Sequence, residues 1–231
     1  MKKFMLVIAL SASITAFGQS RFGDKPGGQL SIGIRSTTSL FSNESGMGRG
    51  FGGQLRLRLF HLVNTEWFGD YITSDIGGGL GNRRDYHIGW SVMFYPPFAY
   101  KNNARLKLQP YLLAGHCFDW TRFESNLFTE NNIAQRFSSA VQAGIGFHLP
   151  LHERVDLSFS GQYMIHFGNE LIATKRTNIA GVDYLYIDED EPEGLEGHLL
   201  LTCSLNFRLA DLWKNKVKGV QDKAPIIEEG Q

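Results

Sequence analysis

The chain has 231 residues, and its 23 basic residues balance its 23 acidic residues, so the formal net charge is zero. This balance does not support nucleic-acid binding, which normally needs a basic face. Beyond the N-terminal region no run of about 20 apolar residues occurs, which excludes a helical membrane protein.

The first eighteen residues have the layout of a secretory signal peptide. Two lysines precede an apolar run at 4–10, and small residues follow as far as Gly18. The apolar run is too short to cross a bilayer as a helix. We therefore expect export, with cleavage between Gly18 and Gln19. No cysteine stands at the cut to carry a lipid anchor.

Eight stretches of the remaining chain alternate between apolar and polar residues. Successive side chains of a strand point to opposite faces, so each stretch predicts a strand with one apolar and one polar face. The clearest is FGGQLRLRLF, in which three leucines alternate with Gln54, Arg56 and Arg58. The predicted strands are residues 28–40, 51–60, 65–75, 85–95, 106–118, 137–149, 155–167 and 197–209.

The lengths of the strands and loops indicate a barrel that crosses a membrane. Strands 137–149 and 155–167 are joined by the short turn PLHER, which predicts an antiparallel hairpin. Each is roughly twice as long as an ordinary strand, the length needed to cross a bilayer at a tilt. Longer loops alternate with mostly short turns, as expected for extracellular loops and periplasmic turns. The predicted fold is an all-β, eight-stranded antiparallel up-and-down transmembrane β-barrel.

The signal peptide, the eight strands and YPPFAYKNNARLKLQPYLLAG (95–115) together resemble the small OmpA/OmpX-type outer-membrane β-barrels. The resemblance covers about residues 29–209. It implies a bacterial outer-membrane protein in contact with outer-membrane lipid and lipopolysaccharide. We expect a signal peptide at 1–18, a barrel at 19–209 and a periplasmic C-terminal tail at 210–231. Unlike some OmpA-type proteins, the chain has no room for a peptidoglycan-binding domain.

Charged residues on the polar faces are expected to form a network in the barrel lumen. An eight-stranded barrel is filled by its own side chains, and an unpaired charge there costs several kcal/mol. A symmetric turn near 63–64 would place Arg56 opposite Asp70 and Arg58 diagonal to Glu66. Asp156 and Arg208 are expected near the periplasmic ends of adjacent strands. The predicted network comprises Arg35, Arg56, Arg58, Glu66, Asp70, Asp156 and Arg208.

On the apolar faces we expect aromatic side chains to form the belts that mark the membrane interfaces. The predicted belt residues are Trp67, Tyr71, Trp90, Phe94, Phe147 and Phe167. The alternation predicts that Cys117 faces inward and Cys203 faces outward, on strands that we do not expect to be adjacent in the sheet. We therefore expect two free thiols rather than a disulfide.

Three histidines, His87, His166 and His198, are expected to face inward near the extracellular mouth. They could bind zinc or copper. The sequence has no H-x-H pair, and we interpret them as ordinary lumen hydrogen-bonding groups. No metal and no cofactor is predicted. The acidic run 188–191 with Glu193 could hold calcium, but it lacks the spacing of a calcium loop and is interpreted as a solvated loop.

The sequence lacks the nucleophile that one class of outer-membrane hydrolases needs. Outer-membrane lipid A 3-O-deacylases carry a His-x-Ser-Asn stretch, and the nearest match here is the segment 166–169, HFGN. Glycine occupies the position of the nucleophile, so a serine–histidine mechanism has no hydroxyl to activate. We predict that the protein is not an enzyme.

The sequence favours a monomeric barrel with a structural or adhesive role that is carried out by its extracellular loops. Three alternatives stay open: an accessory outer-membrane subunit of a secretion or gliding machine, a narrow pore for small solutes, and a lipid A-modifying hydrolase. The first of these implies an envelope protein partner.

Overall fold

The computed structural model describes residues 27–41, 46–96, 108–126, 133–168, 171–189 and 196–213. The described residues form ten strands and no helix long and apolar enough to span a membrane. The strands are β1 (Gln29–Phe41), β2 (Met47–Arg58), β3 (Val63–Ile76), β4 (Gly81–Phe94), β5 (Gln109–Ser125), β6 (Ile133–His152), β7 (Val155–Phe167), β8 (Leu171–Thr177), β9 (Asp183–Glu189) and β10 (Gly197–Asp211).

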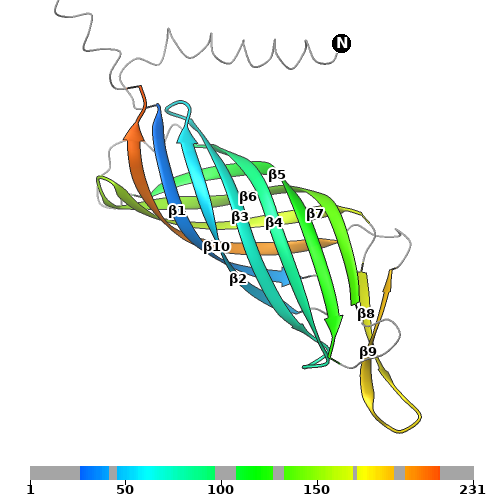
Figure 1. Cartoon of the computed structure of the whole chain (residues 1–231). Coiled ribbons are helices and arrows are strands. Elements are labelled where there is room, and N and C mark those ends of the chain that lie inside the picture. The colour runs from blue at the N-terminus through cyan, green and yellow to red at the C-terminus, as the bar shows by residue number, and fades with distance from the viewer. Residues whose placement is uncertain are drawn as a thin grey trace, which may run out of the picture.

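Eight of these strands close into one antiparallel barrel in the order β1-β10-β7-β6-β5-β4-β3-β2 (Figure 1). Strand β1 pairs with both β2 and β10, which leaves no open edge. The predicted eight-stranded up-and-down barrel is therefore confirmed. We call the end with the short β2–β3 and β6–β7 turns the turn end. The opposite end, where β8 and β9 lie, is the loop end.

Several strands extend further toward the loop end than the sequence predicts. Strand β4 begins at Gly81, β5 runs to Ser125, and β6 begins at Ile133. The stretch that the prediction leaves between strands 106–118 and 137–149 is therefore partly strand, and the prediction of one continuous loop there is wrong. In these extensions the outward positions also carry polar residues such as Arg84 and Glu124, so the apolar alternation that predicts a strand is lost.

Between the predicted strands 155–167 and 197–209, where no strand is predicted, the structure has a separate β-hairpin. Strands β8 and β9 pair with each other and stand apart from the barrel sheet (Figure 1). The side chain of Asn178 accepts hydrogen bonds from the backbone N–H groups of Ala180 and Val182, each at 2.9 Å. Gly181 takes a positive φ of 76°, which glycine adopts without strain. These features form the turn of the hairpin.

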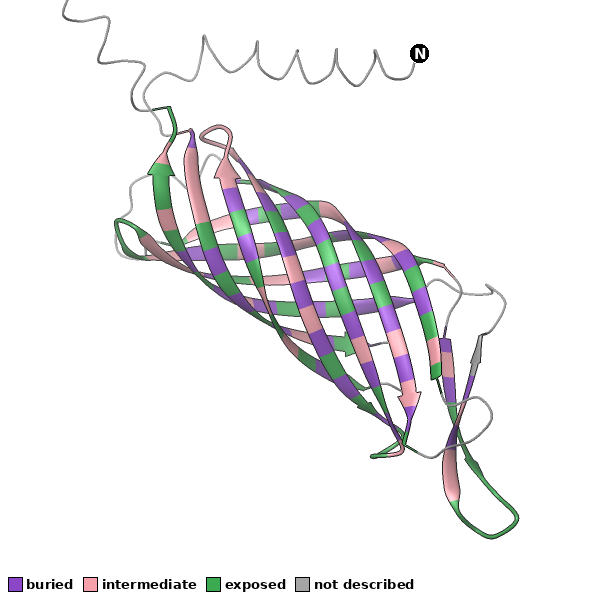
Figure 2. Ribbon diagram, in the orientation of Figure 1, coloured by how far each residue is buried: buried purple, intermediate pink, exposed green. Residues whose placement is uncertain are grey.

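Burial alternates along every barrel strand, as Figure 2 shows. Of the expected belt residues, Tyr71 is half-buried between the rings of Phe51 and Tyr86, with centroids 6.1 and 4.8 Å away. The other five are exposed on the outer face: Trp67, Trp90, Phe94, Phe147 and Phe167. An apolar surface that surrounds a closed barrel is stable only against lipid.

Both cysteines are free thiols, with Cys117 buried in the lumen and Cys203 half-buried. Strand β10 continues to Asp211, two residues past the expected end of the barrel. The predicted signal peptide, its cleavage site at Gly18 and Gln19, and the tail from residue 214 lie outside the described residues, as do the side chains of the acidic run.

Candidate functional site

Toward the turn end, a chain of buried ion pairs crosses the lumen. Arg56 lies 2.7 Å from Glu66 and 3.3 Å from Asp156. Arg35 lies 3.3 Å from Glu66 and 3.0 Å from Asp70. Glu66 is thus shared between two arginines, and five of the expected lumen charges are connected. All except Asp156, which is partly exposed, are nearly inaccessible to water.

The partners within this chain differ from the prediction. Arg56 stands opposite Glu66 in the β2–β3 ladder, whereas Asp70 stands opposite Gly52. The predicted pairing of Arg56 with Asp70 is wrong because the turn is centred near residue 61 rather than at 63–64. Leu59 and Phe60 both donate their backbone N–H groups to the carbonyl oxygen of Val63, which closes the turn early.

The two remaining arginines of the expected network lie nearer the turn end. Arg58 stands opposite Asn64, donates to the carbonyl oxygen of His61 at 3.1 Å, and holds its guanidinium 4.9 Å from the centre of the Tyr95 ring. In this register Arg58 still lies diagonal to Glu66, as expected, although its opposite residue differs. Arg208 is half-buried near Asp156, since β10 and β7 are adjacent.

A layer of apolar side chains lies between most of the ion-pair chain and the loop end of the lumen, and Asp70 reaches past it to stand opposite His87 of β4. Arg35 bounds the layer on one side, with its guanidinium 4.4 Å from the centre of the Phe68 ring. Along β5, β7 and β10 the next inward residues toward the loop end are Asp119, His166 and His198. The members of the layer are Phe68, Ile72, Cys117, Ala140, Met164 and Leu200.

Beyond this layer, a second set of buried charges fills the loop end; we call it the His/Asp chamber. Its members are Arg83, Asp85, His87, Asp119, Arg136, His166, Glu196 and His198. Arg83 lies 2.9 Å from Asp85 and 2.7 Å from Glu196. Arg136 lies 2.6 Å from the other oxygen of Glu196 and 3.5 Å from Asp119.

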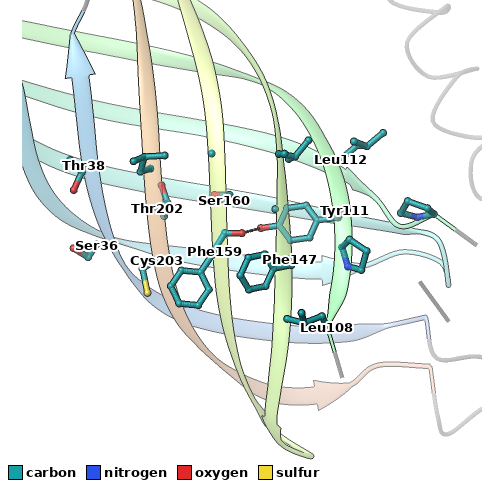
Figure 3. Close-up of a pocket in the computed structure, with 16 residues that line it drawn as sticks. Ser36, Thr38, Leu108, Tyr111, Leu112, Phe147, Phe159, Ser160, Thr202 and Cys203 are labelled. Atoms are coloured by element: carbon teal, nitrogen blue, oxygen red, sulfur yellow. Dashed lines mark hydrogen bonds between the residues drawn. The ribbon is translucent and has the colours of Figure 1, made fainter. Parts of the chain in front are cut away.

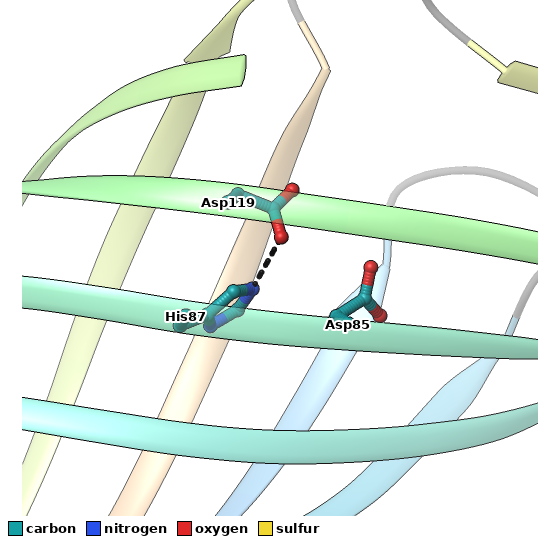
Figure 4. A group of neighbouring side chains, drawn as sticks. All are labelled: Asp85, His87 and Asp119. Atoms are coloured by element: carbon teal, nitrogen blue, oxygen red, sulfur yellow. Dashed lines mark ion pairs between the residues drawn. The ribbon is translucent and has the colours of Figure 1, made fainter. Parts of the chain in front are cut away.

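The structure brings the three expected histidines together in this chamber. The Nε2 atoms of His166 and His198 lie 3.1 Å apart, and His166 Nδ1 lies 3.1 Å from the hydroxyl of Ser138. His87 Nε2 points toward Asp119 Oδ1 at 3.3 Å, and Asp85 lies beside this pair (Figure 4). The alternation did not reveal the five charged members, because Asp85 stands at the very start of a predicted strand and the other four lie just outside the predicted strands.

Glu196 precedes β10 and lies outside the strands that cross the membrane. Burial acts to raise the pKa of its carboxyl group. The guanidinium groups of Arg83 and Arg136 act in the opposite direction and outweigh burial, so the pKa of Glu196 lies below its ordinary value. Glu196 is therefore ionised at neutral pH and links the two arginines across the chamber.

The β8–β9 hairpin covers the chamber and packs on the barrel wall through a cluster of apolar side chains, which we call the lid. Leu185 is fully buried against the barrel, and a Cβ atom built on Gly81 would lie 2.6 Å from Leu185 Cδ2. Glycine at this position thus permits the close approach of the hairpin. The lid consists of Ile76 and Phe123 from the barrel wall with Leu171, Ala173, Leu185 and Ile187 from the hairpin.

Among the hollows elsewhere on the described part of the molecule, one is polar and one is apolar. A polar cavity of about 390 Å³ at the turn end is lined by Arg56, Arg58 and Arg208, among others. A wider apolar hollow of about 1000 Å³ is lined mainly by outward-facing residues of β1, β10, β7, β6 and β5, including Phe147 and Phe159 (Figure 3). Because it belongs to the lipid-facing surface, we assign it to contact with acyl chains.

Comparison with known proteins supports the fold. Neisserial surface protein A has a solved structure that matches with a TM-score of 0.50 at 12% identity, covering 80% of this chain and 100% of that chain. A major outer membrane protein from Thermus thermophilus matches with a TM-score of 0.48 at 12% identity, covering 78% of this chain and 99% of that one. The attachment invasion locus protein Ail of Yersinia pestis matches at 0.48 and 14% identity, covering 79% and 99%. No family model and no curated protein matches the sequence.

The closed barrel, its apolar outer face and its polar lumen define a transmembrane β-barrel protein. Its fold is that of the small eight-stranded outer-membrane barrels, as the similarity to Neisserial surface protein A shows.

Proposed function

We propose that this protein is a non-conducting, non-catalytic outer-membrane anchor that presents the β8–β9 hairpin to a partner outside the cell. It would act as a monomer in contact with outer-membrane lipid and lipopolysaccharide. The observation that carries the proposal is the two-sided hairpin. Its base is buried in the lid, whereas its turn, with Ile179 fully exposed and Val182 half-exposed, projects from the barrel (Figure 1).

The exposed part of the hairpin is held in one shape by its own contacts. Lys175 Nζ lies 2.8 Å from Asp183, and the hydroxyl of Thr177 donates to the same carboxylate at 2.7 Å. The guanidinium of Arg176 lies 3.6 Å from the centre of the Tyr186 ring. A surface element that is ordered before binding loses less conformational entropy on binding, which favours a role in recognition.

The filled lumen supports a barrel that does not conduct. Buried charges, an apolar layer and the lid follow one another along the barrel axis. A continuous water path through the barrel would have to break the apolar layer and displace the ion pairs that fill the lumen, such as Arg35 with Asp70. Steady conductance of the purified protein in planar bilayers would contradict this part of the proposal.

The hairpin is tested with a double variant of its turn, Ile179→Ser with Val182→Ser. A matched control on the same hairpin, Thr174→Ala, leaves the turn intact. We expect whole-cell cross-linking followed by purification in gentle detergent to retain a partner with the wild type and the control and to lose it with the turn variant. A stoichiometric partner that is retained by all three proteins would instead favour the accessory-subunit alternative, with contacts elsewhere on the barrel.

A further inference from the structure

We infer that the His/Asp chamber is a binding site for one divalent transition-metal ion, with His87, Asp119 and Asp85 as its ligands. This inference does not rest on the proposed binding of a partner by the hairpin. The three side chains are fully buried, and one ligand atom from each lies within 4.8 Å of the others (Figure 4). They come from β4 and β5, which are adjacent strands of a rigid sheet.

The distance between the two principal ligand atoms fits a metal ion. His87 Nε2 and Asp119 Oδ1 lie 3.3 Å apart. Two ligands that each lie about 2.0–2.1 Å from a tetrahedral Zn²⁺ are about 3.3 Å apart. An ion can therefore be placed between these atoms without a change in the backbone, and an Asp85 carboxylate oxygen within 4.8 Å of both is the third ligand.

Hydrogen bonding does not account for His87. Neither of its ring nitrogens makes a well-aligned hydrogen bond, and the close polar contact of Nε2 is with Asp119 Oδ1 at 3.3 Å. Asp119 Oδ1 likewise accepts no hydrogen bond. By contrast, His148 at the turn end contacts the hydroxyl groups of Tyr95 and Ser158 with its two nitrogens. The interpretation of the three expected histidines as ordinary hydrogen-bonding groups fits His166, which contacts Ser138 and His198, and does not fit His87.

The charges of the chamber favour a bound cation. Three carboxylates, those of Asp85, Asp119 and Glu196, stand against the two guanidinium groups of Arg83 and Arg136. With neutral imidazoles, these described groups carry one negative charge in excess. Asp70 faces His87 across the β3–β4 ladder, but it is paired with Arg35 and leaves that excess unchanged.

Neighbouring groups hold the ligands in place. The hydroxyl of Thr121 donates to Asp119 Oδ2 at 2.9 Å and is also 2.8 Å from Asp85 Oδ1. Arg136 approaches the same Oδ2 of Asp119, which leaves Oδ1 directed at His87. Such contacts fix the orientation of a ligand and commonly change metal affinity by about 10–100-fold when they are removed.

The donor set selects the class of ion. One imidazole nitrogen and two carboxylate oxygens suit Zn²⁺ or Mn²⁺, whereas Ca²⁺ and Mg²⁺ prefer oxygen ligands alone. Because the lid covers the chamber, we expect the ion to enter while the barrel folds, before the hairpin closes over it.

The test uses the full chain, stripped with EDTA and refolded in detergent with Zn²⁺, Mn²⁺ or Ca²⁺, then dialysed before metal analysis. We expect about one Zn²⁺ per wild-type chain and little Ca²⁺. The variants His87→Gln and Asp119→Asn should bind Zn²⁺ at least about tenfold more weakly. The matched control His148→Gln, a buried histidine of the same lumen, should retain the ion.

Folding of each variant is checked by its mobility in gels with and without heating. If the ligand variants do not fold, the visible absorption spectrum of the wild type refolded with Co²⁺ tests the site instead. Visible absorption typical of four-coordinate Co²⁺ supports the site, and a spectrum like that of aqueous Co²⁺ overturns it. The inference is also overturned if the wild type retains no more Zn²⁺ than His87→Gln, in which case a proton on His87 balances the chamber.

Discussion

Removal of Arg35 provides the strongest test of the ion-pair chain in the lumen. The Arg35 guanidinium is almost fully buried, 3.0 Å from Asp70 and 3.3 Å from Glu66. In the variant Arg35→Met, Glu66 keeps its pair with Arg56 at 2.7 Å, but Asp70 keeps only the hydroxyl of Thr37, at 3.3 Å. The main effect is therefore an unpaired buried carboxylate at position 70.

The expected magnitude follows from that unpaired charge. Removal of one partner from a buried ion pair typically lowers the free energy of unfolding by about 3–5 kcal/mol. Replacing both partners by uncharged residues can leave the free energy of unfolding nearly unchanged, because no charge is then left without a partner. The double variant Arg35→Met with Asp70→Asn should therefore recover most of the stability that Arg35→Met loses.

Urea unfolding in lipid vesicles, followed by tryptophan fluorescence and by gel mobility, measures these free energies. Linear extrapolation gives each value, and the double-mutant cycle gives the coupling between Arg35 and Asp70. The reasoning is refuted if Arg35→Met loses less than about 1 kcal/mol, the range of an exposed ion pair. It is also refuted if the double variant is no more stable than the single one.

Two further predictions concern the loop end. Leu185→Asp places a charge in the lid, so the hairpin should detach from the barrel. Trypsin should then cut the hairpin at least about tenfold faster than in the wild type or in the exposed control Thr174→Asp. Equal rates of cleavage would contradict the packing of the lid. Glu196 has a lowered pKa in the folded protein, so it stabilises the fold above its ordinary pKa of about 4.5 and loses this contribution as the pH falls through the lower, folded value. The difference in the free energy of unfolding between wild type and Glu196→Gln should accordingly be largest at pH 7 and decrease as the pH is lowered. A difference that does not change with pH would exclude the ion pairs with Arg83 and Arg136.

The alternation of apolar and polar residues predicts the barrel because the membrane imposes it. Where a strand faces lipid, its outward residues must be apolar, as with Trp67 and Trp90. Above the membrane the outward positions become polar, as with Arg84 and Glu124, and the two faces no longer differ. The inward residues Asp85 and Asp119 lie in or next to those extensions, which explains why periodicity did not reveal the chamber.

The lumen partners show a second limit of the sequence. Predicted and observed β2–β3 pairings differ by four residues, from Arg56 opposite Asp70 to Arg56 opposite Glu66. Because side chains alternate with a period of two, an even shift keeps every inward residue inward. The sequence therefore predicts which charges enter the lumen, whereas the turn at 59–62 decides which of them meet. No alternation of one strand contains that information.

The lid connects the two proposals physically. The same hairpin buries Leu185 over the chamber and exposes Ile179 at its turn. Any group bound beneath the lid favours the closed hairpin by mass action, because it stabilises only the closed state. A partner that binds the turn in its ordered shape acts on the same equilibrium from outside. The hairpin is thus the element through which the closed lumen and the cell surface can influence each other, without any passage through the barrel.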